Sequence, residues 1–376
     1  SYSFLNLKKS FMYQLVKVLV SQYGSQYIEL KEQQDLISKV IKEEEEAFLR
    51  TLEAGLVKIK NIRKKNVREV SGKEVFELYD TFGFPADLTA LILSDYGISF
   101  NQKDLDSEML AQKERSKQSA KIERGDWKII DSNSKEGFIG YNKFENNIKI
   151  TRYRKIVTKD KEQYQLVFNM TPFYPEGGGQ VGDIGEIRNK NETIDITDTK
   201  RENNLIIHSA DKLPDNINND FVAKINIQDR IASSRNHTAT HLLHEALRNI
   251  LGNHVTQKGS LVSPNYLRFD FSHFSRVEKE DLRKIELAVN QKVLANINLV
   301  EHTNISLSEA QNMGAIMLFG EKYDDTVRMI QFDDSKELCG GSHVDSTGKI
   351  GFFRILSESS ISSGIRRIEA ITGNSA

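Results

Sequence analysis

Two pairs of potential metal ligands in the C-terminal part of the chain most constrain its fold. His237 and His241 stand four residues apart, a spacing that places both imidazoles on one face of a helix. Cys339 and His343 flank a Gly-Gly-Ser bend much further along the chain. One thiolate and three imidazoles suit the tetrahedral coordination of zinc. The sequence therefore predicts one zinc ion held by all four residues, and a fold that brings these distant segments together.

Each signature on its own is weak, because histidine pairs are often incidental and a lone cysteine is usually an inert buried residue. Cys339 is the single cysteine, which excludes an intramolecular disulfide and favours a reducing compartment. The coincidence of the two signatures favours the metal site. His244 is a substitute ligand of lower rank, because its use would leave His237 without a role. The other histidines are interpreted as ordinary core or surface residues: His208, His254, His273 and His302.

The ligands alone do not decide what the zinc does. A zincin peptidase needs a glutamate directly after the first histidine, and Thr238 stands there. Four protein ligands could also close the coordination sphere, as in a structural zinc site. Polar residues that a structural site would not require indicate a substrate pocket instead: Thr240, Gln257, Ser260 and Arg366.

The length and the changing periodicity of the chain predict a multidomain α+β protein. A chain of 376 residues favours two or three domains. Residues 1–125 are expected to form a helical region, because apolar residues recur at three- and four-residue steps from Leu36 to Leu56. Further helical segments are expected at Glu74–Tyr79, Leu88–Leu93 and Gln102–Glu123, the last as a charged helix or a linker.

Residues 126–227 are predicted to form a small β-domain, either barrel-like or a strongly curved sheet. β-Branched and aromatic residues fill short segments from Ile148 to Phe168, with Asn, Asp and Gly clusters between them. The glycine-rich segment, Pro175–Asp183, has three successive glycines that permit a close backbone approach or a positive φ. A flexible hairpin tip is an equally good interpretation. Without the features of a P-loop or a dinucleotide fingerprint, the segment does not predict nucleotide binding.

Residues 228–376 are predicted to form a two-layer α+β domain that contains the zinc site. Helix patterns cover Thr238–Leu251 and Val277–Leu294. Strand patterns cover Leu267–Phe271, Val327–Phe332 and Gly351–Leu356. We expect the helices to cover one face of a single sheet.

Without a membrane-span or signal-peptide pattern the sequence favours a cytoplasmic protein, and its charge gives only a local signal. The net charge of −1 gives no global signal for nucleic acid, but a basic run extends from Lys58 to Arg68. Such a run is either a solvated helix face or a contact with phosphates. No run approaches the ~20 apolar residues of a membrane span, and the first residues lack a signal-peptide pattern.

Several further motifs accompany the ligand signatures: Leu78–Thr89, Thr171–Gln180, Gln257–Val262, Arg268–His273, Phe319–Tyr323 and Gly364–Ala370. Together they resemble the editing domain of bacterial-type alanyl-tRNA synthetases and their free-standing relatives. Leu78–Thr89 is similar to the tRNA-recognition part of the family. One departure is Ser342, where the family usually has threonine; both side chains carry a hydroxyl.

This resemblance implies a piece of a longer synthetase. The class II catalytic domain, which makes alanyl-adenylate, has no counterpart here, and neither has the family's C-terminal region. ATP and Mg²⁺ are therefore expected only for the absent catalytic domain. The helical region favours a synthetase over a free-standing editing protein.

The implied chemistry is hydrolysis of the ester that joins serine or glycine to tRNA(Ala), while the full-length enzyme would ligate alanine. An alanine pocket discriminates weakly against an added hydroxyl or a missing methyl group, so a second site is needed. Thr240 and Gln257 match positions that line the family's amino-acid pocket, and Ser260 and Arg366 match neighbouring ones. We hypothesise that they and zinc hold the substrate and a water molecule near the ester carbonyl. Arg366 could also meet phosphate or developing negative charge.

The implied partner is tRNA(Ala), through its acceptor stem and its aminoacylated 3′ end, with neither a membrane nor DNA as a partner. Gln180, with Gly178 and Gly179, is expected to cover the terminal adenosine. Asp80 is the candidate contact for the G·U wobble pair, although an N-cap for the following turn explains it equally well. Basic residues that could position tRNA phosphates include Lys64 and Lys65.

Three rival interpretations remain open at this point. In the first, the zinc is purely structural and the chain only binds tRNA. In the second, the protein is a free-standing deacylase. The third, a metallopeptidase, is the most distant.

Overall fold

The chain divides into two compact units, Ser1–Lys121 and Ile122–Ala376. The computed structural model describes residues 9–64, 67–80, 84–118, 123–157, 162–317, 323–362 and 364–376. Both helices and sheets are present, as the α+β prediction requires. No helix in these described ranges is long and apolar enough to cross a membrane. The first unit ends close to the predicted limit of the helical region, and the second contains both the predicted β-domain and the predicted zinc domain.

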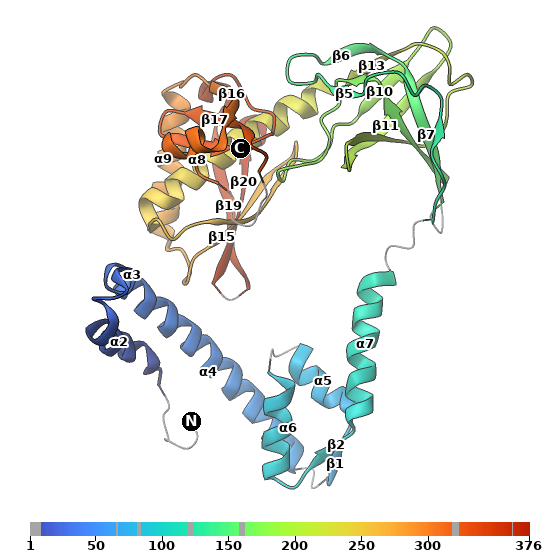
Figure 1. Ribbon diagram of the computed structural model, residues 1–376. Coiled ribbons are helices and arrows are strands. Elements are labelled where there is room, and N and C mark those ends of the chain that lie inside the picture. The colour runs from blue at the N-terminus through green and yellow to red at the C-terminus, as the bar shows by residue number, and fades with distance from the viewer. Residues whose placement is uncertain are drawn as a thin grey trace. The chain divides into compact units, whose positions relative to one another are not determined.

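The first unit is helical, as its apolar periodicity predicts (Figure 1). Its core includes Ile59, Leu78, Phe84 and Leu93. A Cβ atom at Gly55 would overlap the ring of Phe84, so the glycine lets this ring lie directly against helix α4. The elements are η1 (Met12–Gln14), α2 (Leu15–Tyr23), α3 (Ile28–Glu32), α4 (Gln34–Lys64), α5 (Gly72–Asp80), α6 (Ala86–Asp95), α7 (Gln102–Gln118) and the parallel strand pair β1 (Glu69–Val70) and β2 (Ser99–Phe100).

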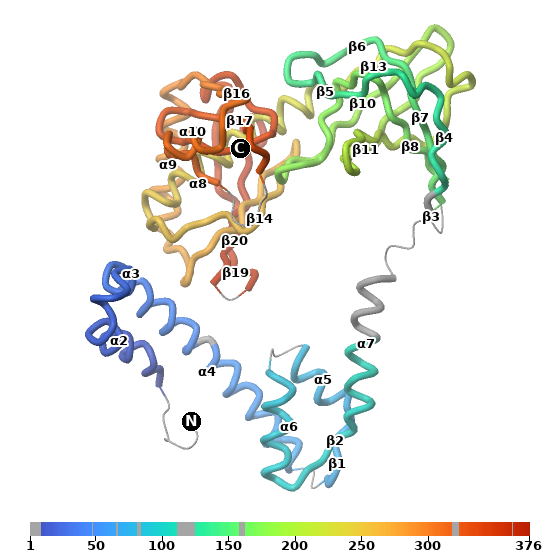
Figure 2. The backbone as a smooth tube through the Cα atoms, in the orientation of Figure 1, coloured from blue at the N-terminus to red at the C-terminus, as the bar shows by residue number. Residues whose placement is uncertain are grey.

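The second unit begins with a large antiparallel sheet, which Figure 2 traces along the backbone. The strand order is β3-β7-β8-β12-β11-β10-β13-β6, and β4 also pairs with β7. Strands β5 and β9 form a separate parallel pair. The strands are β3 (Glu123–Arg124), β4 (Lys128–Ile129), β5 (Gly137–Phe138), β6 (Glu145–Ile148), β7 (Ile150–Val157), β8 (Glu162–Phe168), β9 (Met170–Thr171), β10 (Gly185–Arg188), β11 (Thr193–Glu202), β12 (Leu205–Ala210) and β13 (Phe221–Ile225).

This sheet folds around its own apolar core, which includes Ile148, Leu166, Phe168, Ile196 and Phe221. Among the described strands, no ladder joins β6 to β3 or β7 at the other end of the order. Instead, the side chain of Asn146 in β6 donates to the carbonyl of Met170 in β9 at 3.0 Å. The strands predicted between Ile148 and Phe168 are confirmed as β6, β7 and β8.

Helix α8 (Ile227–Leu251) leads from this sheet into the C-terminal part of the unit (Figure 1). It begins eleven residues before the predicted helix because the side chain of Asn226 caps it, accepting hydrogen bonds from the backbone N–H groups of Gln228 and Asp229. The following elements are β14 (Gln257–Val262), β15 (Leu267–Ser272), α9 (Lys279–Leu294), β16 (Val300–Ser306), α10 (Leu307–Asn312), β17 (Thr326–Phe332), β18 (Ser335–Leu338), η2 (Thr347–Ile350), β19 (Phe353–Ser362), β20 (Ile365–Thr372) and η3 (Gly373–Ser375).

The expectation of a single sheet in this region is wrong. Four strands form one sheet in the order β14-β15-β20-β19, and three strands form a second sheet in the order β16-β17-β18. The predicted strand at 327–332 is the central strand of the second sheet and not a neighbour of β15. Strand pairing depends on contacts between residues distant in sequence, so the alternation that identifies a strand does not identify its partner.

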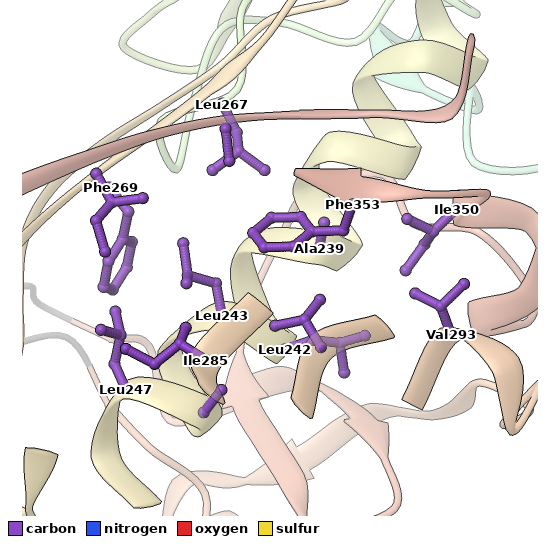
Figure 3. Close-up of a cluster of buried hydrophobic side chains, with 14 of the residues drawn as sticks. Ala239, Leu242, Leu243, Leu247, Leu267, Phe269, Ile285, Val293, Ile350 and Phe353 are labelled. Carbon is purple, nitrogen blue, oxygen red and sulfur yellow. The ribbon is translucent and has the colours of Figure 1, made fainter. Parts of the chain in front are cut away.

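Helices α8 and α9 pack against the four-stranded sheet through a continuous apolar core (Figure 3). Leu243 and Leu247 of α8 lie close to Phe269 of β15 and Ile285 of α9. Phe353 of β19 lies beside Ala239, one turn earlier in α8. Loss of one such leucine or isoleucine side chain typically costs about 2–5 kcal/mol. This core fixes the helix that carries the first two candidate metal ligands.

Candidate metal centre and adjoining pocket

Four side chains from two segments converge in the second unit. His237 and His241 lie on adjacent turns of α8, and Cys339 and His343 lie in the loop after β18. Their ligand atoms are all within 4.8 Å of one another. The Sγ of Cys339 is 3.4 Å from the Nε2 of His237 and 3.4 Å from the Nε2 of His343. Bonds of about 2.0–2.3 Å to a tetrahedral zinc ion give ligand separations of about 3.3–3.8 Å, so the two distances from Cys339 fit such an ion, and the thiolate and three imidazoles are the donor types that zinc binds.

The outer nitrogens of two histidines are hydrogen bonded. The Nδ1 of His237 is 2.9 Å from the Oε1 of Gln180, which also accepts from the backbone N–H of Ser342 at 2.9 Å. Because an amide oxygen only accepts, Nδ1 of His237 carries the proton and its Nε2 keeps a free lone pair. The Nδ1 of His343 is 3.1 Å from the hydroxyl of Thr238, so the contact occupies Nδ1 and the Nε2 of His343 faces the cluster, 3.4 Å from the Sγ of Cys339. Such contacts fix the orientation of ligand rings.

A buried carboxylate lies beside the third histidine. Glu337 is 6% exposed, and its Oε2 is 3.5 Å from the Nδ1 of His241. Its other oxygen is 2.8 Å from the Nδ1 of His244. His244, the substitute ligand considered from sequence, therefore contacts this carboxylate and is not one of the four residues that converge. Carboxylates beside metal-binding histidines commonly raise their basicity.

Burial sets the protonation states of these groups. It lowers the pKa of His237 and that of His343 well below the ordinary histidine value, with smaller contributions from neighbouring histidines and Arg328. Burial also lowers the pKa of His241, although the charge of Glu337 opposes it. For Glu337 itself, burial raises the pKa, but the adjacent histidines outweigh this and hold it below its usual value. Neutral imidazoles are the form that binds a metal ion.

The loop that carries the cysteine is held from both sides. The Arg328 guanidinium donates to the carbonyls of Cys339 and Gly341 at 2.9 and 2.8 Å. The hydroxyl of Tyr141 donates to the carbonyl of the glycine between them at 2.7 Å. A Cβ atom at Gly341 would overlap the ring of His237. A glycine at position 341 is therefore required for the loop to pass this close to the helix, whereas a Cβ atom at Gly340 would meet no neighbour.

A pocket of about 300 Å³ opens onto the cluster. Three of the four candidate ligands line it: His237, His241 and Cys339. Three of the four pocket residues predicted from sequence line it as well, and so does one glycine of the glycine-rich segment: Thr240, Gln257, Ser260 and Gly178.

The polar side chains of the pocket are oriented by neighbouring groups. The hydroxyl of Thr240 donates to the carbonyl of Asn236 at 2.8 Å, which leaves its oxygen as an acceptor. The amide nitrogen of Gln257 is 3.3 Å from the hydroxyl of Ser260. The pocket thus offers hydrogen-bond acceptors close to the metal ligands.

Arg366 is not among the residues that line this pocket. Its Nε donates to the carboxylate of Glu358 at 2.6 Å, and its side chain is 14% exposed. The contact with the substrate or with phosphate that the sequence suggests for Arg366 stays a prediction.

The glycine-rich segment packs against β14. Gly179 has a φ of 81°, and a Cβ atom there would overlap the side chain of Ser260. The N–H of Val262 donates to the carbonyl of Gly179 at 2.7 Å, and the N–H of Val181 donates to the carbonyl of Val262 at 3.0 Å. Gln180 is 0% exposed, and its amide bonds to a candidate metal ligand. The expected contact of this segment with the terminal adenosine stays a prediction.

The candidate tRNA contacts lie in the first unit. Asp80 is the last residue of α5 and Lys64 the last of α4, and both are exposed. Lys65 and the turn that follows Asp80, residues 81–83, lie outside the described residues. The N-cap position of α6 is occupied by Pro85.

Sequence reasoning missed two residues of this site, Glu337 and Arg328. Glu337 precedes Cys339 by two residues, so the strand alternation of β18 could have indicated a carboxylate near the metal. No local pattern indicates Arg328. Its partners are the carbonyls of Cys339 and Gly341, and these contacts depend on how the loop after β18 passes β17.

Comparison with protein families adds an independent observation. Residues 1–230 match the family model for class II tRNA synthetases (A). Residues 327–369 match the model for the second additional domain of threonyl and alanyl tRNA synthetases. The second match contains all of β17 except its first residue, and it also contains Cys339 and His343.

Whole-chain relatives agree with these matches. The chain is 51% identical to an alanine–tRNA ligase of Cytophaga hutchinsonii over 100% of its own length and 44% of that protein. It is 53% identical to the ligase of Flavobacterium psychrophilum and 52% identical to that of Bacteroides fragilis, in each case over 99% of this chain and 43% of the relative. The chain thus spans less than half the length of these relatives.

Proposed function

This chain belongs to the alanyl-tRNA synthetase family, and from that premise we propose that its second unit is an editing deacylase. Its substrates would be Ser-tRNA(Ala) and Gly-tRNA(Ala), and the bond cleaved would be the ester between the amino acid and the 3′ end. Alanine ligation, with ATP and Mg²⁺, would belong to longer proteins of the family. We expect the protein to act in the cytoplasm, with tRNA(Ala) as its partner and no membrane or DNA partner.

One observation carries this proposal: the polar pocket opens directly onto three of the four metal ligands. A purely structural zinc site is normally closed and needs no such pocket. Thr240, Gln257 and Ser260 place hydrogen-bond donors and acceptors in the cavity that His237 and Cys339 also line. This arrangement is typical of a site that holds a small polar group next to a metal ion.

Zinc, held by His237, His241, Cys339 and His343, would supply electrostatic polarisation of the bound group. The chain's own residues would do the rest. The oxygen of Thr240 can accept from the substrate's ammonium or hydroxyl group, because its own proton is already donated to Asn236. Gln257, oriented by Ser260, can hold the ester or a water molecule beside it.

The same acceptors account for selection of serine over alanine. A site built to hydrogen-bond a hydroxyl rejects an analogue that lacks it by roughly 10⁴–10⁵-fold, because the site's polar groups are then left unpaired. Correctly charged Ala-tRNA(Ala) would therefore be left intact. Glycine has no hydroxyl either, and its clearance is proposed from the family alone.

Contacts with tRNA are proposed for exposed residues of the first unit and for the glycine-rich segment. Lys64 and Lys65 would meet phosphates of the acceptor stem, and Asp80 would meet the G·U pair. Gly178, which lines the pocket, and its neighbour Gly179 would approach the terminal adenosine.

Release of labelled serine from Ser-tRNA(Ala) tests the proposal. Wild-type protein should release serine and leave alanine on Ala-tRNA(Ala). Cys339→Ala should remove most of the activity, and Gln257→Ala should reduce it about 10–100-fold, as loss of a strong polar contact would. Gln163→Ala, in strand β8 and outside the pocket, is the matched control and should keep wild-type activity.

A second candidate is a tRNA-binding module with a structural zinc, which the presence of four protein ligands favours. That function predicts that the folded, zinc-loaded chain binds tRNA(Ala) but releases no serine, and that zinc removal unfolds the second unit. Serine release that is lost in both Cys339→Ala and Gln257→Ala would exclude it.

A further inference from the structure

We infer that Gln180 is a positioning residue for the metal centre, and that it couples zinc binding to docking of the glycine-rich segment on β14. The inference rests on the proposed zinc site but not on the hydrolytic reaction. Gln180 contacts the Nδ1 of His237, while the Nε2 on the other side of the ring faces the remaining candidate ligands.

The amide of Gln180 joins three parts of the chain. Its oxygen accepts from the Nδ1–H of His237 and from the backbone N–H of Ser342, both at 2.9 Å. Its nitrogen is 2.9 Å from the hydroxyl of Ser342, which also contacts the hydroxyl of Ser234 at 2.8 Å. The backbone N–H of Ser342 can only donate, so it fixes which end of the amide carries the oxygen. That oxygen can only accept from His237, which selects the metal-binding tautomer of its ring.

Two glycines make this contact possible. A Cβ atom at Gly341 would overlap the His237 ring and lie 3.2 Å from the Oε1 of Gln180. A Cβ atom at Gly179 would overlap Ser260 and hold the segment away from β14. Both glycines thus allow the helix, the cysteine loop and the glycine-rich segment to come close enough for the amide of Gln180 to contact His237 and Ser342.

The backbone on both sides of Gln180 is tied to β14. Val181 donates to the carbonyl of Val262, and Val262 donates to the carbonyl of Gly179. The side chain that bonds a metal ligand and the backbone that docks on β14 therefore belong to the same three residues. Zinc binding must favour the docked segment, and the docked segment must favour zinc binding, by the same factor.

Zinc affinity of the purified chain tests the positioning role. Loss of an outer-shell contact typically lowers metal affinity about 10–100-fold, so Gln180→Leu should show a loss of this size in competition with a chromogenic chelator. Gln180→Glu keeps the acceptor for both donors and should restore most of the affinity. Gln163→Leu is the matched control, because Gln163 lies in β8, bonds to Asp211 and does not line the pocket; the zinc affinity of this variant should stay unchanged. Circular dichroism checks that each variant is folded.

Amide hydrogen exchange tests the coupling, first in the unaltered protein and then in Gln180→Leu. Added Zn²⁺ should slow exchange of the Val181 and Val262 amides, and the slowing should exceed that of the β20 amides, which report the general stability of the domain. In Gln180→Leu, zinc should slow the two docking amides no more than those of β20.

The outcomes separate this inference from the proposed site. Wild-type zinc affinity in folded Gln180→Leu, or equal protection of Val181 with and without zinc, would overturn the coupling while leaving the metal centre intact. A wild-type chain that binds no zinc would overturn the metal centre itself. Zinc binding without serine release would overturn only the deacylase function.

Discussion

His208 shows how one residue can respond to pH through burial alone. It is fully buried, with its ring stacked on Phe168 at 3.9 Å between centroids. Its Nδ1 is 3.1 Å from the carbonyl of Leu166 and its Nε2 is 2.8 Å from the hydroxyl of Thr171. A carbonyl only accepts, so Nδ1 donates and Nε2 accepts, which is the pattern of a neutral imidazole. Burial accordingly lowers the pKa of His208 to about 3.

The folded protein should therefore lose stability as the pH falls below the ordinary histidine pKa. Between about pH 6.5 and pH 3, His208 is protonated in the unfolded chain but neutral in the folded protein. The free energy of unfolding therefore falls by about 1.4 kcal/mol for each unit by which the pH is lowered in this window. Above this window His208 adds no pH dependence. Urea unfolding at pH 7.5 and 5.5 should show a loss about 1.4 kcal/mol larger for wild type than for His208→Gln. Equal losses in the two proteins would contradict the assignment.

Residue patterns identified the four candidate metal ligands but not the contacts that hold them in place. The four candidates follow from two local spacings, and the structure brings all four together. The part of Gln180 could not be predicted in this way, because its partners His237 and Ser342 lie 57 and 162 residues away in sequence. The three glycines before Gln180 indicated that the backbone approaches another part of the protein closely, but they did not indicate which part.

At the scale of elements, a buried ion pair joins α8 to the glycine-rich segment. The Arg230 guanidinium pairs with the carboxylate of Asp183, and both side chains are less than 8% exposed. Arg230 also donates to the carbonyl of Pro172 at 3.1 Å, and Asp183 accepts from the N–H of Tyr174 at 2.8 Å. Burial raises the pKa of Asp183 above its usual value, although Arg230 opposes the shift.

Removal of the arginine alone should be costly. Arg230→Met leaves the Asp183 carboxylate buried without its partner and should lower the free energy of unfolding by about 3–5 kcal/mol. The double variant Arg230→Met, Asp183→Asn removes the charge but keeps an acceptor for Tyr174, so its loss should be smaller. Chemical unfolding of the three proteins measures both losses. A double variant as unstable as the single one would show that packing, not the unpaired charge, dominates.

Elements that rest on local patterns were predicted well, and those that rest on distant pairing were not. The apolar steps from Leu36 to Leu56 fall within α4, and the two shorter patterns became α5 and α6. The division of the C-terminal strands into two sheets was missed, because β16 and β17 pair across a connection that contains α10. The alternation of apolar and polar residues in a strand does not specify which other strand it will pair with.

At the scale of the whole molecule, the two units depend on different sources of stability. The first unit rests on an apolar core around Leu78 and Phe84, and the described part of it contains no cluster of metal ligands. The second unit has its own apolar cores and also the candidate metal centre, whose ligands tie α8 to the loop after β18. Metal should therefore stabilise one unit and not the other.

Zinc removal should shift only one of two thermal transitions. A ligand at a free concentration of 100 times its dissociation constant stabilises the folded form by about 2.7 kcal/mol. Scanning calorimetry with and without a strong chelator should show the transition of the second unit at a lower temperature in the chelator, and that of the first unit unchanged. Cys339→Ala should show the lower temperature even with zinc present. A shift of both transitions would contradict separate stabilisation of the units.

The docking of the glycine-rich segment on β14 also limits how this protein can exchange parts with its relatives. Gly179 faces Ser260, and Gln180 faces Ser342, so each half of the second unit carries residues shaped for the other. A chimaera that took residues 126–227 from a relative with a bulkier side chain opposite Ser260, or without an amide opposite Ser342, would combine two well-folded halves into a defective site. Residues 126–227 and the domain that follows them should therefore be exchanged together.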